Sequence, residues 1–86
     1  MNKIHNIQHV RFTNETMQIE IDGKQYEFKL KDISSTLSVA TGEQRNAFDV
    51  SPSGYGIHWP LVDEDLSIDG LLNISHALPV KKTKAA

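Results

Sequence analysis

The stretch MQIEIDGKQYEFKL, from Met17 to Leu30, decides the fold. Apolar and polar residues alternate on both sides of Asp22 and Gly23, as they do in strands that bury one face. An Asp-Gly pair favours a two-residue type I′ turn, because both central positions of that turn need a positive φ. The stretch therefore predicts a β-hairpin with Ile19 opposite Tyr26.

The side-chain pattern of this hairpin indicates the same register. With Ile19 opposite Tyr26, Met17 lies opposite Phe28, and the apolar residues of both strands share one face. A shift by one residue would place Ile19 against Glu27 and break the apolar face. Turn chemistry and hydrophobic pattern thus select one register independently.

Beyond the hairpin the apolar residues recur at helical spacing. This spacing predicts a short helix that is capped at its start by Asp32 or Ser34 and stopped by Gly42. Thr41 and Gln44 have the spacing of a capping box and could begin a further helical turn.

A second pair of strands follows. The alternation from Phe48 to Val50 predicts one strand, Ser53 to Gly56 reads as a tight turn, and Ile57 to Trp59 reads as the return strand. Pro60 ends that strand because it has no N–H to donate. The acidic run after it is expected to be a connecting loop.

The last element is expected to be a helix that begins with Ser67 as its cap and ends before Pro79. The element order is then β-β-β-α-β-β-α, which indicates an α+β fold with a small antiparallel sheet and helices packed on one face. Residues 1–80 are expected to form a single domain and residues 81–86 a basic flexible tail. The predicted core consists of Ile19, Phe28, Leu37, Phe48, Trp59, Leu71 and Leu72.

The composition is that of a globular chain, with 86 residues of which 38% are apolar and 23% are charged. Without cysteine the chain has no disulfide, Cys-ligated metal or thiol nucleophile. A formal net charge of −2 argues against direct binding of nucleic acid, which requires a cationic face. Nothing resembles a signal peptide or a long apolar span, so we expect a cytoplasmic protein that does not bind membranes.

One segment resembles a calcium loop. Asp65, Ser67, Asp69 and Gly70 match the first positions of such a loop, but His76 stands where the bidentate glutamate is required. Ser67, Asp69 and Gly70 are also explained as residues that start a helix. We therefore predict no calcium site.

The histidines and serines do not predict a reactive site either. His5 and His9 would be about 13 Å apart along a strand, too far to share one zinc ion. Ser51 and Ser53 lie in a turn that contains proline and glycine, where hydroxyls commonly bond to local backbone. We therefore predict no catalytic residues, no metal and no cofactor.

One cluster remains as a candidate binding site, since aromatic residues stand close to acidic ones in the sequence. A lone tryptophan in a small domain is either a core side chain with its ring N–H bonded or an exposed aromatic for partner binding. The candidate binding residues are Tyr55, His58, Trp59, Asp63, Glu64 and Asp65.

The segment GYGIHWPLVDEDLSIDGLL, from Gly54 to Leu72, resembles the C-terminal signature of a family of small bacterial domains of unknown function, catalogued under number 2442. ATGEQRNAFDV, from Ala40 to Val50, and the Asp-Gly hairpin also fit, so the resemblance covers residues 5–78. It implies an α+β fold and a bacterial origin. The family has no established catalytic residues, so none is carried over to this chain.

The same resemblance implies two kinds of context. Some members carry an appended helix-turn-helix domain, and others are encoded beside a second small protein in pairs that look like toxin–antitoxin modules. This sequence ends shortly after its last predicted helix, so we expect no DNA-reading domain.

Two functions follow as hypotheses. The first is a non-catalytic protein-interaction domain that binds a small, toxin-like protein or a second copy of itself. The alternative is a small-molecule-sensing regulatory domain with a cleft near Trp59. A concave pocket around Trp59 would favour the alternative, and a flat apolar patch or an unpaired strand edge would favour the first.

The segment Ile4–Phe12 is the predicted strand edge. Apolar and polar residues mix there without a clean period, which favours a strand paired on one side only. Such an edge can accept a strand from another chain. The other reading, that the last helix or the tail covers this edge, stays open.

Overall fold

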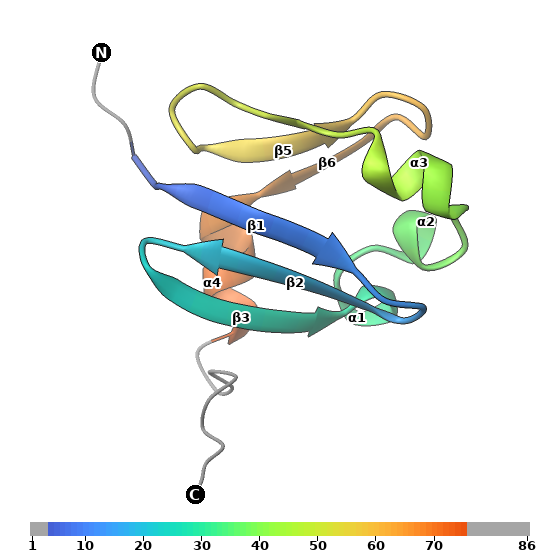
Figure 1. Ribbon diagram of the computed structural model, residues 1–86, viewed down its shortest axis with the longest axis horizontal. Coiled ribbons are helices and arrows are strands. Elements are labelled where there is room, and N and C mark those ends of the chain that lie inside the picture. Colours follow the sequence, from blue (N-terminus) through green and yellow to red (C-terminus); the bar gives the residue numbers. More distant parts are fainter. Residues whose placement is uncertain (1–3, 76–86) are drawn as a thin grey trace, which may run out of the picture.

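The computed structural model describes residues 4–75 and contains six strands and four helices in that range (Figure 1). They are β1 (Ile7–Phe12), β2 (Thr16–Ile21), β3 (Lys24–Lys29), α1 (Leu30–Ile33), α2 (Ser35–Ser38), α3 (Gly42–Asn46), β4 (Asp49–Val50), β5 (Gly56–Trp59), β6 (Glu64–Ser67) and α4 (Ile68–Ser75). The α+β class and the broad element order are confirmed. The predicted end of the last helix at Pro79 and the basic tail lie outside the described residues.

The strands form two antiparallel sheets, where the sequence suggested one. The first has the order β1-β2-β3 and the second the order β4-β5-β6. In Figure 1 the second sheet lies beside β1, and α4 lies behind the first sheet. The strand β4 is only two residues long, and three short helices separate it from β3 in the chain.

The hairpin of β2 and β3 is confirmed in turn type and in register. Asp22 has a φ of 54° and Gly23 a φ of 86°, as the central residues of a type I′ turn require. Ile19 pairs with Tyr26 and Met17 with Phe28.

The edge position of β1 is also confirmed. It is the outer strand of the first sheet and pairs only with β2. The strand begins at Ile7 rather than Ile4 and has a bulge between Gln8 and Arg11, where His9 has a φ of 55°. The bulge inserts one residue, so the half-buried positions change from odd to even numbers along the strand. This change is the physical reason why the sequence lacked a clean period.

The predicted helix after the hairpin divides into α1 and α2 at Ser34. Ser34 has an extended backbone, and its side-chain oxygen accepts a hydrogen bond from the N–H of Leu37, so it caps α2. Gly42 does not stop a helix but is the first residue of α3. The capping box of Thr41 and Gln44 at that point is confirmed.

The acidic run is not only a loop, because Glu64 and Asp65 belong to β6. The chain reverses after β5 with Asp63 at a φ of 53°, and Glu64 then pairs with Trp59. Ser67 ends the strand and caps α4, since its side-chain oxygen accepts a hydrogen bond of 2.9 Å from the N–H of Gly70.

The core lies between the hairpin, the second sheet and α4, and Trp59 is its largest side chain. Trp59 is fully buried, and its Nε1 donates a 2.9 Å hydrogen bond to the carbonyl of Arg45. The centroids of the Phe12 and Phe48 rings lie 6.4 and 6.2 Å from the centroid of the Trp59 ring. Of the predicted core, Phe48 and Leu72 are only partly buried, and the other five residues are buried.

Arg45 is a buried residue whose role the sequence did not reveal. Its guanidinium donates hydrogen bonds to the carbonyls of Leu37, Ser38, Thr13 and Asn14. It thereby holds the turn between β1 and β2 against the helical segment.

Candidate functional site

The second sheet presents a row of polar side chains on its outer face. His58 on β5 pairs with Asp49 on β4 and with Asp65 on β6, and cross-strand partners point to the same side of a sheet. The Nδ1 of His58 lies 2.8 Å from Oδ1 of Asp65. Ile57 and Trp59 alternate with this row and are buried on the opposite side. We call this surface, with Tyr55, the β5 face.

Tyr55 is the most exposed aromatic residue on the β5 face, with 60% of its surface exposed. A shallow depression of about 410 Å³ lies beside it, lined in part by His58, Asp65 and Leu66. Both apolar and polar groups are therefore within reach of a molecule that lies in this depression.

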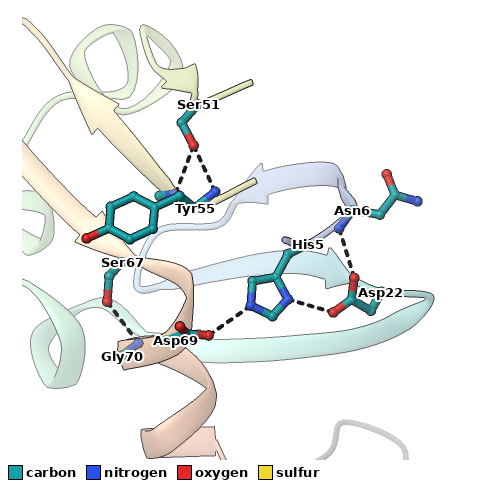
Figure 2. A network of polar contacts seen from close by, with 9 residues as sticks. His5, Asn6, Asp22, Ser51, Tyr55, Ser67, Asp69 and Gly70 are labelled. Carbon is teal, nitrogen blue, oxygen red and sulfur yellow. Dashed lines mark hydrogen bonds and ion pairs between the residues drawn. The ribbon is translucent and has the colours of Figure 1, made fainter. Parts of the chain in front are cut away.

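The turn before β5 holds Tyr55 in position. The hydroxyl oxygen of Ser51 accepts hydrogen bonds from the N–H groups of Tyr55 at 2.8 Å and Gly56 at 3.1 Å (Figure 2). Gly54 has a φ of 74°, and a Cβ there would collide with the carbonyl of His5. The Ser51 hydroxyl thus bonds to local backbone, as its position in the turn predicts.

The chain segment that forms the β5 face has acidic residues and no lysine or arginine. Between Asn46 and Ser75 the chain has five acidic residues and neither lysine nor arginine. Asp49 and Asp65 are exposed on the β5 face itself, and Asp69 follows β6 in the first turn of α4. The exposed carboxylates of Asp49 and Asp65 can attract cationic groups.

The six candidate binding residues do not form one site. Tyr55, His58 and Asp65 lie together on the β5 face, whereas Trp59 is in the core. Glu64 points to the other side and accepts a hydrogen bond from the hydroxyl of Ser34. The sixth, Asp63, is exposed in the turn between β5 and β6. Because side chains alternate along a strand, Trp59 and its cross-strand partner Glu64 point away from the β5 face.

A second polar cluster, which the sequence did not predict, joins three distant segments around His5. Its Nδ1 lies 2.7 Å from Oδ2 of Asp22 in the hairpin turn, and its Nε2 lies 2.8 Å from Oδ1 of Asp69 in α4 (Figure 2). Asp22 also accepts a hydrogen bond from the N–H of Asn6. His5 has only 13% of its side chain exposed. No local pattern could have indicated these contacts, because the partners are 17 and 64 residues away.

The charges of this cluster stabilise one another. Hydrogen bonds to Asp22 and Asp69 raise the pKa of His5 above its ordinary value of 6.5. The hydrogen bond from Asn6, followed by that from His5, lowers the pKa of Asp22 below 3.8. The cluster is thus an ion-paired link between the segment before β1, the hairpin turn and α4.

Neither a cluster of metal ligands nor a membrane-spanning helix is found within residues 4–75. No group of three or more histidine or acidic side chains is placed to hold a metal ion. No helix in this range is long and apolar enough to cross a membrane.

Comparison with known proteins gives a family and a similar structure. The family described as "Protein of unknown function (DUF2442)" matches residues 7–77. A crystal structure of a protein of unknown function from Rhodospirillum rubrum ATCC 11170 is similar, with a TM-score of 0.65 and 25% sequence identity over 80% of this chain and 86% of that chain. No curated protein matches the chain significantly. Because the family match spans most of the fold, including β1, the hairpin and the β5 face, the chain belongs to the DUF2442 family.

Proposed function

We propose that this chain is a non-catalytic protein-interaction domain that binds a basic segment of a small partner protein on the β5 face. The observation that carries the proposal is the combination of an exposed Tyr55, a depression of about 410 Å³ and a surrounding chain segment without lysine or arginine.

Each part of the β5 face has a recognised role in binding cations. An exposed tyrosine ring attracts a guanidinium or ammonium group over its face. The carboxylates of Asp49 and Asp65 can accept charge-assisted hydrogen bonds from the same side chains. The ring of Tyr55, which lines the depression, also offers apolar contact to the stem of a lysine or arginine.

The family resemblance supports a partner of a particular kind. Members encoded beside a second small protein, in pairs that look like toxin–antitoxin modules, suggest that the partner is a small toxin-like protein. In that case the chain acts in the bacterial cytoplasm, and its acidic face covers a basic surface of the partner.

The volume of the depression also supports a small-molecule-sensing function, since sites for small ligands measure about 300–1,000 Å³. A ligand there would contact Tyr55 and His58, because Trp59 is buried in the core. The open, one-sided form of the β5 face favours a protein segment.

A display selection with random peptides tests the proposal. We expect selected peptides to be rich in lysine and arginine and to bind more weakly at high salt. The double variant Asp49→Asn/Asp65→Asn should lower their affinity about tenfold or more, because it removes both carboxylates. Tyr55→Ala should lower it as well.

The matched control is Glu15→Gln, which removes an exposed acid from the turn between β1 and β2 and should leave the affinity unchanged. Thermal melting of each variant separates lost binding from lost folding. Selected peptides that lack basic residues, or that bind the double variant as well as the parent chain, would contradict the proposal.

A further inference from the structure

The hairpin turn determines which backbone groups of β3 face away from its sheet. In a two-residue hairpin the residues next to the turn, Ile21 and Lys24, form a hydrogen-bonded pair, and such pairs alternate along the strands. The N–H and C=O groups of Gln25 and Glu27 therefore point outward. Within residues 4–75 no other strand pairs with this side of β3, and no backbone hydrogen bond joins Gln25 or Glu27 to another segment.

β3 is the most regular sheet edge in the described chain. All six of its residues pair with β2 in one unbroken register. By comparison, β1 is interrupted by the bulge at His9, β4 has two residues and β6 has four. A bulge or a short strand weakens an edge as a template, and β3 has neither. The structure therefore moves the edge-pairing hypothesis from β1 to β3.

We propose that two copies of this chain associate through their β3 strands, antiparallel, with Tyr26 at the two-fold axis. In this register Gln25 lies opposite Glu27 of the second copy, and the outward backbone groups of both residues form hydrogen-bonded pairs. Each amide side chain can also donate to the carboxylate opposite it. The β1-β2-β3 sheets of the two copies then become one sheet of six strands.

Charge selects this register over the next one. Hydrogen bonds between the two β3 strands form only in registers that place residues with outward backbone groups opposite one another. The neighbouring register with the same overlap would put Glu27 directly against Glu27 of the second copy, and like charges opposite each other are destabilising. No such clash arises with Tyr26 at the axis.

A depression beside β3 favours a second copy as the occupant of this edge. It measures about 430 Å³ and is lined by Phe28, Ile33 and Ile74 together with the carboxylate of Asp32. In the proposed register Lys24 of the second copy lies opposite Phe28. Its aliphatic stem can cover the apolar lining while its ammonium group reaches the carboxylate.

The two proposed surfaces are separate. Figure 1 shows β3 and β5 at opposite sides of the molecule. A dimer formed through β3 would thus leave both β5 faces open and could bind two partner segments.

Cysteine cross-linking tests the register, and the chain suits it because it has no cysteine of its own. A mixture of Gln25→Cys and Glu27→Cys chains should form a mixed disulfide readily, since the paired Cα atoms would lie about 5.5 Å apart. Each variant alone should cross-link severalfold more slowly, because its thiols would be diagonal neighbours about 7–8 Å apart. A mixture of Gln18→Cys and Glu20→Cys chains, on the same polar face of the central strand, is the control.

Sedimentation of the unmodified chain from about 1 µM to about 1 mM provides the second measurement, with a dimer expected at the upper end. A strict monomer over this range would overturn the proposal. Cross-linking of the mixed pair no faster than the control, or fastest for Glu27→Cys alone, would overturn it too.

Discussion

At the scale of single residues, positive φ angles mark the places where the chain changes direction. Within residues 4–75 the residues other than glycine with this conformation are His9, Asp22 and Asp63, at a bulge and at two turns. Asp22 has a second function, because its carboxylate bonds to His5 and to the N–H of Asn6. The hairpin turn is therefore connected to the N-terminal segment as well as to its own strands.

Replacement of Gly23 by alanine tests the backbone requirement of this turn. A Cβ at Gly23 would have no atom within 4 Å, so only its φ of 86° opposes a side chain. We expect Gly23→Ala to lower the free energy of unfolding by about 1–2 kcal/mol, measured by urea denaturation. Gly42 is equally open but has no positive φ, so Gly42→Ala should cause no loss. Equal effects of the two substitutions would refute this explanation.

At the scale of elements, Ser34 joins two helices and the second sheet. Its backbone N–H donates to the carbonyl of Leu30 in α1, and its side-chain oxygen accepts from Leu37 in α2. Its hydroxyl also donates to Glu64 in β6. One buried serine thus sets the angle between α1 and α2 and connects them to the strand that the sequence did not predict.

Ser34→Ala should destabilise the fold by about 1–2 kcal/mol, because it removes a helix cap and leaves Glu64 without this donor. Ser35→Ala is the matched control, since Ser35 is the exposed neighbour and no cap depends on its hydroxyl. Chemical denaturation of both variants measures the difference. A loss for Ser35→Ala as large as that for Ser34→Ala would show that the cap is not the cause.

At the scale of the whole molecule, the His5 cluster connects the segment before β1, the hairpin turn and α4. Ion pairs from His5 to Asp22 and Asp69 join these segments, together with the backbone hydrogen bond from the N–H of Asp22 to the carbonyl of Asn6. The strength of the links depends on the charge of the imidazole.

The pH dependence of stability should therefore change when His5 is replaced. Because the pKa of His5 is raised in the folded state, its contribution is complete below about pH 6.5 and is lost as the pH rises through the folded-state pKa. The pKa of Asp22 is lowered, so its contribution is present above about pH 3.8 and is lost as the pH falls through its folded-state pKa. The stability difference between the parent chain and His5→Asn should be largest between these values and should shrink at alkaline pH.

Melting temperatures from pH 4 to pH 9 measure this difference. His9→Asn is the control, because His9 is a nearby histidine on β1 whose closest acidic contact, with Glu20, is 3.9 Å long. A stability difference for His5→Asn that stays constant with pH would contradict the ion-paired link.

The sequence by itself determined the features that depend on neighbouring residues. The type I′ turn, the hairpin register, the capping box of α3 and the cap of α4 each follow from residues a few positions apart. Trp59 as a bonded core side chain was one of two readings of the sequence, and the structure selects it. Of the six candidate binding residues that the sequence suggested, Tyr55, His58 and Asp65 line one depression, and their role in binding stays a prediction.

Only the tertiary structure decided the features that depend on distant partners. The division into two sheets and the pairing of the acidic run as β6 arise from contacts between segments. The same holds for the four carbonyls bound by Arg45 and for the bridge from His5 to Asp22 and Asp69. A polar residue has the same sequence signature whether it lies in water or bonds across the fold. Its partner is set by chain packing, which hydrophobic periodicity does not encode for polar positions.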